Sequence, residues 1–189
     1  MKKTLIVTAH PASWGFTHKI ADRYKEVVEK NGGEIEIIDL YKDKAQPFLS
    51  FEDMSEMKTT EEQKYYQDKI AWASELVLVY PVWWMWMPAI MKNWIDWNFS
   101  SGFAFKYDKD GNHKTLLDGR TARVFATADG PELLYKLLAK PMMSMLIGKG
   151  VMGYVGIKNQ SFDVFAAMVK KRNDADRAKM LAVVAKRAT

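Results

Sequence analysis

The chain has 189 residues, of which 48% are apolar and 27% are charged, and its formal net charge is +5. This balance is ordinary for a globular protein, so it excludes a disordered or fibrous chain, and we interpret residues 1–189 as a single domain. The chain contains no cysteine, which excludes disulfides, thiolate metal sites and cysteine nucleophiles. The sequence pI of about 9.2 is a mild basic bias.

Strand-like and helix-like segments alternate along the chain. The first apolar run, residues 4–9, is short, continuous and β-branched, which is typical of a strand buried on both faces. The apolar residues that follow it recur at helical spacing, and Asn31-Gly32-Gly33 supplies a left-handed stop. For the whole chain, the pattern predicts strands over residues 4–9, 35–40, 76–80, 123–127 and 151–157, and helices over 17–31, 60–74, 88–98 and 132–147, with one or two more helices after residue 161.

Three segments carry more specific signals. Thr60 and Gln63 fit a capping box that opens the second predicted helix. The polar run from Asp108 to Asn112 indicates a turn, in a surface hairpin or loop. Pro141 lies inside the predicted helix over residues 132–147, so we expect it to kink or split that helix.

Neither of the two most apolar stretches resembles a targeting or membrane segment. Residues 4–9 are too few for the core of a signal peptide, and His10-Pro11 ends them. The longest stretch, from Leu76 to Met91, is shorter than the roughly 18 residues of a spanning helix and is interrupted by two prolines. We therefore expect a cytoplasmic protein with no membrane insertion.

Strands that alternate with helices predict an α/β fold with a parallel sheet and helices on both faces. Five strands favour the flavodoxin-like order 2-1-3-4-5 over a six-stranded dinucleotide-binding fold. Ligands of such sheets bind outside the carboxyl ends of the strands, beside the point where the strand order reverses. The loops after the first, third and fourth predicted strands should therefore converge on one cleft.

The first of these loops covers residues 10–18 and leads directly into a helix N-terminus. It offers free backbone N–H groups, the positive end of the helix dipole, the Thr17 hydroxyl and the imidazole of His10, all of which suit a phosphate. The alternative is purely structural: Ser13 or Thr17 caps the helix and His10 only packs. The residues of this loop alone do not decide between the two.

The second loop holds four large side chains in a row, Trp83-Trp84-Met85-Trp86. Flat aromatic rings at the end of a strand favour a stacking wall for a planar ring. The alternative is a hydrophobic plug or a dimer surface, and both interpretations hold if the cleft lies at a subunit interface. In the third loop, Asp129-Gly130 permits close backbone approach. Tyr135, one turn further on, either reaches back to the ligand or is a half-buried helix tyrosine.

Three other features are not assigned to a functional site. The string Gly148-x-Gly150-x-x-Gly153 fits a dinucleotide fingerprint but precedes a predicted strand, so we take its glycines as strand-packing residues. The three histidines lack a carboxylate-rich setting, so no metal site is expected. The basic residues near the C-terminus are Lys170, Lys171, Arg172, Arg177, Lys179, Lys186 and Arg187. They predict the solvated face of a helix rather than a nucleic-acid surface, with Met180, Leu181, Val183 and Val184 on its apolar side.

Several motifs of the chain resemble the flavin-dependent NAD(P)H:quinone oxidoreductases of flavodoxin-like fold, a family that includes modulator-of-drug-activity proteins, general-stress reductases and ancillary flavoproteins of potassium efflux systems. The resemblance covers roughly residues 1–157. The motifs are Ala9-His10-Pro11, Phe16-Thr17, Tyr80-Pro81-Val82-Trp83-Trp84-Met85-x-Met87-Pro88-Ala89-Ile90-Met91-Lys92-x-Trp94-Ile95-Asp96, Gly102-Phe103-Ala104-Phe105-x-Tyr107, Leu117-x-Gly119-Arg120 and residues 150–157. The long central motif is the most specific of them.

The resemblance implies which residues form the site. For the flavin these are His10, Gly15, Phe16, Thr17, Pro81, Val82, Trp83, Trp84, Met85, Thr127, Ala128, Asp129 and Gly130. Tyr135 matches an active-site tyrosine of the family. Phe105 and Tyr107 match aromatic residues that enter the substrate pocket from the partner subunit of a homodimer.

The chain departs from the family pattern at four positions in or beside these segments, Gly15, Thr17, Asp129 and the expected substrate-side residue Trp86. Gly15 stands where the family often has Ser, so one hydroxyl contact to the phosphate is missing, and Thr17 stands where Asn is frequent. Trp86 replaces a usual glycine, and its bulk narrows the substrate side. Asp129 replaces a residue of a Thr-Thr-Gly-Gly loop, and its carboxylate would oppose negative charge on a reduced flavin unless it is paired or points away.

The resemblance further implies the activity: a flavin takes a hydride from NAD(P)H and transfers it to a quinone or similar acceptor bound in the same slot. FMN is favoured over FAD, because the chain has no long extension to hold an adenosine. Two alternatives remain open. A flavodoxin-type electron carrier is one, although such carriers are usually acidic. The other is a redox-sensing ancillary subunit of a membrane transporter, which would bind the transporter through its basic C-terminal segment.

Overall fold

The computed structural model describes residues 1–51, 58–168 and 172–189. Its centre is a parallel sheet of five strands, β1 (Lys3–Thr8), β2 (Glu34–Asp39), β3 (Glu75–Pro81), β6 (Thr121–Thr127) and β7 (Lys158–Phe165), in the order β2-β1-β3-β6-β7. Numbered within the sheet alone, this is the predicted order 2-1-3-4-5. The flavodoxin-like architecture is thus confirmed, and the strand order reverses beside β1 and β3.

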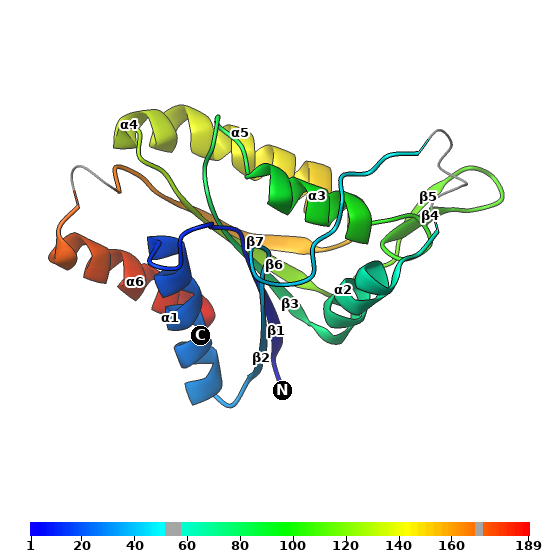
Figure 1. Ribbon diagram of the computed structural model, residues 1–189, viewed down its shortest axis with the longest axis horizontal. Coiled ribbons are helices and arrows are strands. Elements are labelled where there is room, and N and C mark those ends of the chain that lie inside the picture. Colours follow the sequence, from blue (N-terminus) through cyan, green and yellow to red (C-terminus); the bar gives the residue numbers. More distant parts are fainter. Residues whose placement is uncertain (52–57, 169–171) are drawn as a thin grey trace.

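Helices cover both faces of the sheet (Figure 1). On one face, α1 (Phe16–Lys30) and α6 (Asp174–Ala188) pack over a core that includes Ile6 and Val77. On the other, α2 (Glu61–Trp72), α3 (Ala89–Asn98) and a long helical segment over residues 132–155 pack over a core that includes Leu5 and Leu78. Adjacent strand residues alternate between the two cores because successive side chains of a strand point to opposite faces.

The long helical segment stays helical across Pro141, so the expected split does not occur, but its turns change from π-helical to α-helical there. It comprises α4 (Glu132–Leu134), the π-helical η2 (Tyr135–Ala139), α5 (Lys140–Met145), the π-helical η3 (Leu146–Met152) and the 3₁₀ turn η4 (Gly153–Val155). Pro141 lies in the first turn of α5, directly after the wider π turns. A proline is tolerated there because an N–H is not needed for a regular helical bond.

The fifth strand is not where the sequence placed it. Residues 151–157 form the end of the helical segment, which Gly156 stops with a φ of 89°, and the strand β7 follows at Lys158–Phe165. Met152 and Val155 are buried at helical spacing. β7 is an edge strand that begins with polar residues, so it lacks the continuous apolar run that marks the central strands.

Because the strand begins later than predicted, the glycines before it and the helix after it also differ from the prediction. Gly148, Gly150 and Gly153 lie in helical turns, not in a strand. At Gly148 a Cβ would lie only 2.8 Å from Nδ2 of Asn159, so this glycine allows the helix to approach β7. The C-terminal helix begins at Asp174, because the segment after Ser161 first completes the strand.

Two local predictions are confirmed by side-chain hydrogen bonds. The Thr60 hydroxyl accepts a hydrogen bond from the Gln63 backbone N–H at 3.1 Å and caps α2. The reciprocal half of the capping box is not formed, because the Gln63 Oε1 has no hydrogen-bond partner among the described residues, while the Gln63 Nε2 donates to the Trp97 carbonyl. The antiparallel hairpin of β4 (Phe105–Tyr107) and β5 (His113–Thr115) encloses the predicted turn, in which Asp108 accepts two backbone N–H groups.

A buried carboxylate lies at the amino end of β3. Glu75 is 3% exposed and contacts Lys2 and Arg123, with N–O distances of 3.0 Å to each. It also accepts hydrogen bonds from the hydroxyl groups of Tyr24, at 2.7 Å, and Thr4. Burial and the neighbouring Glu75 charge raise the pKa of the Tyr24 hydroxyl far above its usual value, so Tyr24 stays a donor. This cluster joins β1, α1, β3 and β6 at the end of the sheet opposite the loops described next.

Within the described ranges, no helix combines the length and the apolar character needed to cross a bilayer.

Candidate active site

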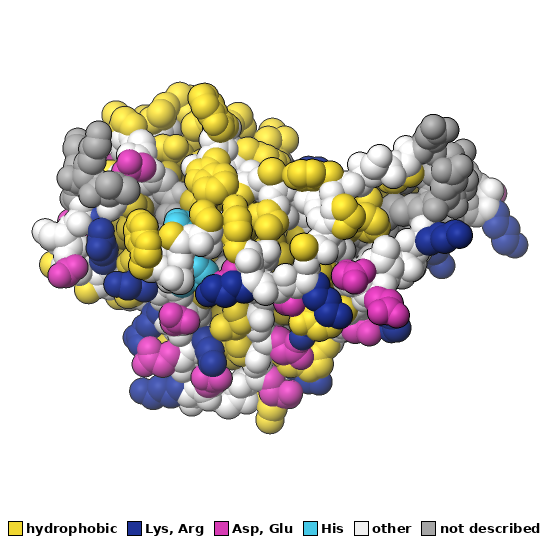
Figure 2. All heavy atoms as spheres, viewed as in Figure 1, with side chains coloured by type: hydrophobic (Ala, Val, Ile, Leu, Met, Phe, Trp, Pro, Cys, Tyr) yellow, Lys and Arg dark blue, Asp and Glu magenta, His cyan; other side chains and the backbone are white. Residues whose placement is uncertain are grey.

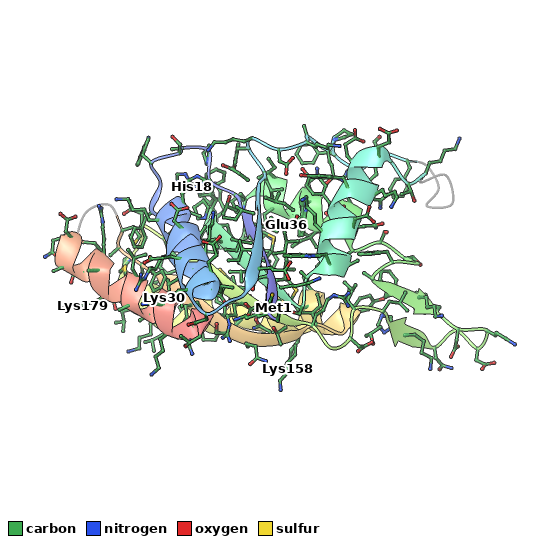
Figure 3. All side chains as sticks on the ribbon, turned by 90° about the horizontal axis from the view of Figure 1, so that it is seen from below. Met1, His18, Lys30, Glu36, Lys158 and Lys179 are labelled. Carbon is green, nitrogen blue, oxygen red and sulfur yellow. The ribbon has the colours of Figure 1, made fainter. Side chains whose placement is uncertain are left out.

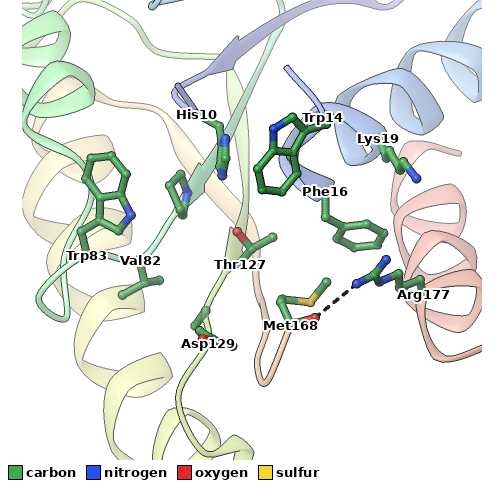
Figure 4. A pocket seen from close by; sticks show the side chains of 13 residues that line it. His10, Trp14, Phe16, Lys19, Val82, Trp83, Thr127, Asp129, Met168 and Arg177 are labelled. Atoms are coloured by element: carbon green, nitrogen blue, oxygen red, sulfur yellow. Dashed lines mark hydrogen bonds between the residues drawn. The ribbon is translucent and has the colours of Figure 1, made fainter. Parts of the chain in front are cut away.

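The three loops predicted to converge do so at the carboxyl ends of β1, β3 and β6, around a cavity of about 410 Å³. Figure 4 shows Val82 and Trp83 on one side of it, Lys19 and Arg177 on the opposite side, and His10, Trp14 and Thr127 between them. The residues that line the cavity are His10, Trp14, Gly15, Phe16, Lys19, Pro81, Val82, Trp83, Thr127, Ala128, Asp129, Met168 and Arg177. Nine of them belong to the set implied by the resemblance.

The first loop opens α1 without a side-chain cap. The N-cap residue is Gly15, and neither Ser13 nor Thr17 caps the helix, so the capping alternative is wrong. The buried Thr17 hydroxyl instead lies 3.4 Å from the Thr127 hydroxyl and ties α1 to β6, outside the cavity lining. The first N–H groups of a helix have no partner within the helix, and the helix dipole adds positive potential there. This end of the cavity therefore suits an anion.

His10 explains why residue 15 is glycine. A Cβ at position 15 would lie 2.6 Å from Nδ1 of His10, which is closer than non-bonded atoms approach. The same Nδ1 lies 3.0 Å from the Ala12 carbonyl oxygen and 3.1 Å from the Ala12 backbone nitrogen, so the loop holds the ring in place. Burial lowers the pKa of His10 below its ordinary value, which favours the neutral form of the ring.

Two cations flank the anion-binding end of the cavity. Lys19 comes from α1, and Arg177 comes from α6, which packs beside α1 (Figure 3). The Arg177 Nη2 donates to the Met168 carbonyl at 3.4 Å, and its buried Nε has no partner among the described residues. A buried guanidinium N–H without a partner is unfavourable unless a ligand accepts from it.

Arg177 is the main residue that the sequence analysis missed, because it was assigned to a solvated helix face. That assignment is also wrong for Arg172, which precedes α6, is mostly buried and pairs with Glu132. Arg187 pairs with Asp163 but stays 42% exposed, which fits the solvated face. On the opposite side, Val183 is exposed rather than packed in the core. Lys179 and Lys186 are exposed as predicted, and Lys170 and Lys171 lie outside the described residues. Trp14, Lys19 and Met168 were not predicted as site residues either.

The tryptophan loop is a tight turn. Trp83 and Trp86 exchange backbone hydrogen bonds at 2.9 and 3.0 Å, and Trp84 and Met85 between them have φ values of 50° and 62°. Two successive residues in the left-handed region define a type I′ turn. This backbone conformation is unfavourable for residues other than glycine and asparagine. Trp83 lines the cavity, whereas the Trp84 side chain is 100% exposed. The N–H of Trp83 is occupied within the turn, whereas the N–H groups of Trp84 and Met85 donate to no backbone carbonyl of the described residues. Neither Trp84 nor Met85 is in the cavity lining.

The third loop contributes Thr127, Ala128 and Asp129 to the cavity. Gly130 is not in the lining: a Cβ there would lie 2.6 Å from Cε2 of Tyr135, so the half-buried tyrosine ring covers it. The Gly130 carbonyl accepts a hydrogen bond from the Ala167 N–H, which ties the loop to the segment after β7. Tyr135 therefore lies directly behind the loop that forms one wall of the cavity.

The expected substrate residues lie elsewhere in this chain. Trp86 is partly buried against the core that includes Leu5 and Leu78, and it is absent from the cavity lining. Phe105 and Tyr107 belong to the β4–β5 hairpin, at the opposite end of the molecule from α1 and α6 (Figures 1 and 3). One chain alone therefore does not bring the hairpin to its own cavity.

An exposed apolar surface, which we call the leucine–methionine face, covers the long helical segment (Figure 2). It consists of Leu133, Leu134, Leu137, Leu138, Met142, Met145 and Leu146. The segment begins directly after the third loop, so this face starts beside the cavity. Contiguous exposed apolar surface of this kind is typical of a protein–protein interface.

Comparison with known proteins agrees with this geometry. A profile of the family described as flavodoxin-like fold matches residues 2–188. The chain belongs to this family. A Haemophilus influenzae protein named uncharacterized NAD(P)H oxidoreductase is 34% identical over 167 residues, which cover 85% of this chain and 82% of that protein. FMN-dependent NADH:quinone oxidoreductase 2 of Clostridium perfringens is 27% identical, over 98% of this chain and 100% of its own.

Solved structures show the same fold. The NAD(P)H:quinone oxidoreductase of Methanothermobacter marburgensis superposes with a TM-score of 0.85 at 23% identity, over 99% of this chain and 95% of that one. An FMN-dependent NADH-azoreductase of Bacillus anthracis in complex with FMN gives a TM-score of 0.75 at 22% identity, over 100% and 98% of the two chains. The predicted fold and family are confirmed.

Proposed function

We propose that this protein is a flavin-dependent NAD(P)H:quinone oxidoreductase that holds FMN in the cavity at the carboxyl ends of β1, β3 and β6. The observation that carries the proposal is the polarity of the cavity. One end has a helix N-terminus and two cations, and the other end has the flat ring of Trp83. The relatives named above support this assignment, because two of them are named as NAD(P)H or NADH oxidoreductases.

The residues present fit the two halves of FMN. The N–H groups at the start of α1, Lys19 and the unpartnered Nε of Arg177 suit its phosphate. Pro81, Val82 and Trp83 suit the planar ring system, which is mostly apolar on its faces. A cavity of about 410 Å³ lies within the usual range of roughly 300–1,000 Å³ for cofactor sites. FAD is the alternative flavin, and chromatography of the released cofactor distinguishes the two.

When bound, FMN supplies the hydride chemistry between NAD(P)H and the acceptor. The chain contributes binding, orientation and charge. The backbone N–H groups of Trp84 and Met85 are the donors proposed for negative charge on the ring system, because both are free of the turn's own hydrogen bonds. We propose that NAD(P)H and a quinone-like acceptor use the same open slot in turn. The cytoplasmic location stays a prediction.

We propose that the Tyr135 hydroxyl donates to the ligand, because Tyr135 matches the active-site tyrosine of the family and its ring packs on Gly130, at the end of the loop that forms one wall of the cavity. Tyr135→Phe keeps the ring and removes only the hydroxyl. We expect both the reduction of the bound flavin and its reoxidation by quinone to slow, because a donor to the ligand is lost. Stopped-flow absorbance measures both half-reactions. Unchanged rates in both would exclude this role.

We propose a homodimer in which the leucine–methionine face meets a second copy. Burial of these side chains removes a large apolar surface from water. In the same dimer, Phe105 and Tyr107 of the partner complete the acceptor side of the cavity, which they do not reach within one chain. Sedimentation of the wild-type protein as a monomer at micromolar concentration would contradict this part of the proposal.

The absorption spectrum of the purified protein tests the function. We expect a yellow preparation with flavin bands, bleached anaerobically by NAD(P)H and restored by a quinone. A colourless protein that does not take up added FMN would refute the proposal. A yellow protein that NAD(P)H does not bleach would favour an electron carrier.

A further inference from the structure

Four aromatic side chains gather where the β4–β5 hairpin meets the end of the long helical segment. The imidazole of His113 lies 4.2 Å from the Tyr154 ring and stacks at 5.7 Å on Phe105, measured between ring centroids. The Phe105 ring meets Tyr154 edge-on at 5.1 Å. The hydroxyl oxygens of Tyr107 and Tyr154 are 2.7 Å apart and form a hydrogen bond. The cluster therefore joins two elements through one polar contact between tyrosines.

Stability alone does not explain this hydrogen bond. Tyr107 is 56% exposed and Tyr154 is 41% exposed, so water can satisfy both hydroxyl groups. An exposed hydrogen bond only replaces bonds to water and contributes little net stability. What it does provide is orientation, because it fixes Tyr107 relative to the helix end, whereas an exposed side chain otherwise rotates freely.

Either of the two hydroxyl groups can be the donor of this hydrogen bond, which is 2.7 Å long. When Tyr154 donates, the Tyr107 oxygen accepts, and the proton of Tyr107 is available for a ligand. A hydroxyl that accepts one hydrogen bond becomes a better donor of the next, because the two bonds polarise each other.

We propose that Tyr154 is a positioning residue that holds the Tyr107 hydroxyl so that Tyr107 donates its proton in a hydrogen bond to a carbonyl oxygen of the acceptor. The inference rests on the proposed function, in which Tyr107 reaches the cavity of the partner subunit. Negative charge develops on the carbonyl oxygen of a quinone as it is reduced, and a preoriented donor stabilises that charge. The acceptor class that benefits is therefore carbonyl compounds, not electron acceptors in general.

Oxidation of the prereduced holoprotein, followed by stopped flow, tests this. Tyr154→Phe and Tyr107→Phe each keep the ring and remove the hydroxyl. We expect either change to slow oxidation by a quinone about 2- to 10-fold, as for loss of one hydrogen bond. Oxidation by ferricyanide, which has no carbonyl group, should be unchanged. The double variant should be no slower than Tyr107→Phe alone, because both changes remove the same interaction.

Tyr41→Phe is the matched control, because Tyr41 is equally exposed at 41% and lies outside the cluster. Three results would each overturn the inference. Tyr154→Phe could be oxidised by quinone at the wild-type rate, the variants could slow equally with ferricyanide, or the rate losses could add in the double variant. Light scattering shows whether each variant keeps the oligomeric state of the wild type. If the reduced wild-type protein reacts with neither acceptor, the proposed function itself fails, which is a different result from a failure confined to the variants.

Discussion

Replacing Glu75 with alanine is expected to lower the free energy of unfolding by about 3–5 kcal/mol, the usual effect of breaking a buried ion pair. The carboxylate is 3% exposed and is the shared partner of Lys2, Arg123 and the Tyr24 hydroxyl. Its removal leaves the Arg123 guanidinium and the buried Tyr24 hydroxyl without their acceptor between packed elements. Urea unfolding followed by circular dichroism measures the change.

Glu29→Gln is the matched control for this experiment. Glu29 pairs with Lys25 on the surface of α1, with both side chains about half exposed. Surface pairs of this kind contribute roughly 0–1 kcal/mol, so the control should unfold close to the wild type. If Glu75→Ala unfolds within about 1 kcal/mol of the control, the cluster contributes less than a buried pair should.

Replacing Arg177 with glutamine is expected to weaken FMN binding by about 10- to 100-fold, the usual effect of losing a hydrogen bond between charged groups. The guanidinium lines the anion-binding end of the cavity, and its buried Nε has no partner among the described residues. Glutamine keeps some length and polarity but removes the charge. Titration of the apoprotein with FMN, followed by quenching of flavin fluorescence, measures the dissociation constant.

Lys179→Gln removes a charge from the same helix at an exposed position and should leave FMN affinity unchanged. Comparing the two variants separates a local contact from the general basic charge of α6, because both lower the net charge equally. Equal affinity for Arg177→Gln and Lys179→Gln would show that Arg177 does not contact the phosphate. Raising the salt concentration should weaken FMN binding by the wild type, since the proposed contact is electrostatic.

The central strands and their loops could be predicted because their signals are local. β1, β3 and β6 each contain a short apolar run that is buried on both faces, and each is followed by a distinctive loop. β7 was misplaced by several residues, because an edge strand with a polar start has no such run. The glycines before it resembled strand packing but instead allow a helix to approach the sheet.

The details of the site depended on contacts distant in sequence. Trp84 has the same side chain as Trp83, yet it is fully exposed because the hydrogen bonds between Trp83 and Trp86 impose a tight turn. From the sequence, Gly15 indicated only that a serine hydroxyl contact to the phosphate is missing. The structure shows that His10 occupies the space that a side chain at position 15 would need. Neither result is visible in the spacing of residues along the chain.

By itself, the sequence determined the strand order and therefore the edge of the sheet at which the loops of β1, β3 and β6 meet, because alternation of buried strands and helices permits few topologies. Only the tertiary structure decided which side chains face the cavity. Arg177 and Met168 reach it because α6 packs beside α1, and Tyr107 and Tyr154 meet because the hairpin folds against the end of the long helical segment. Such contacts depend on how whole elements pack, which no local pattern encodes.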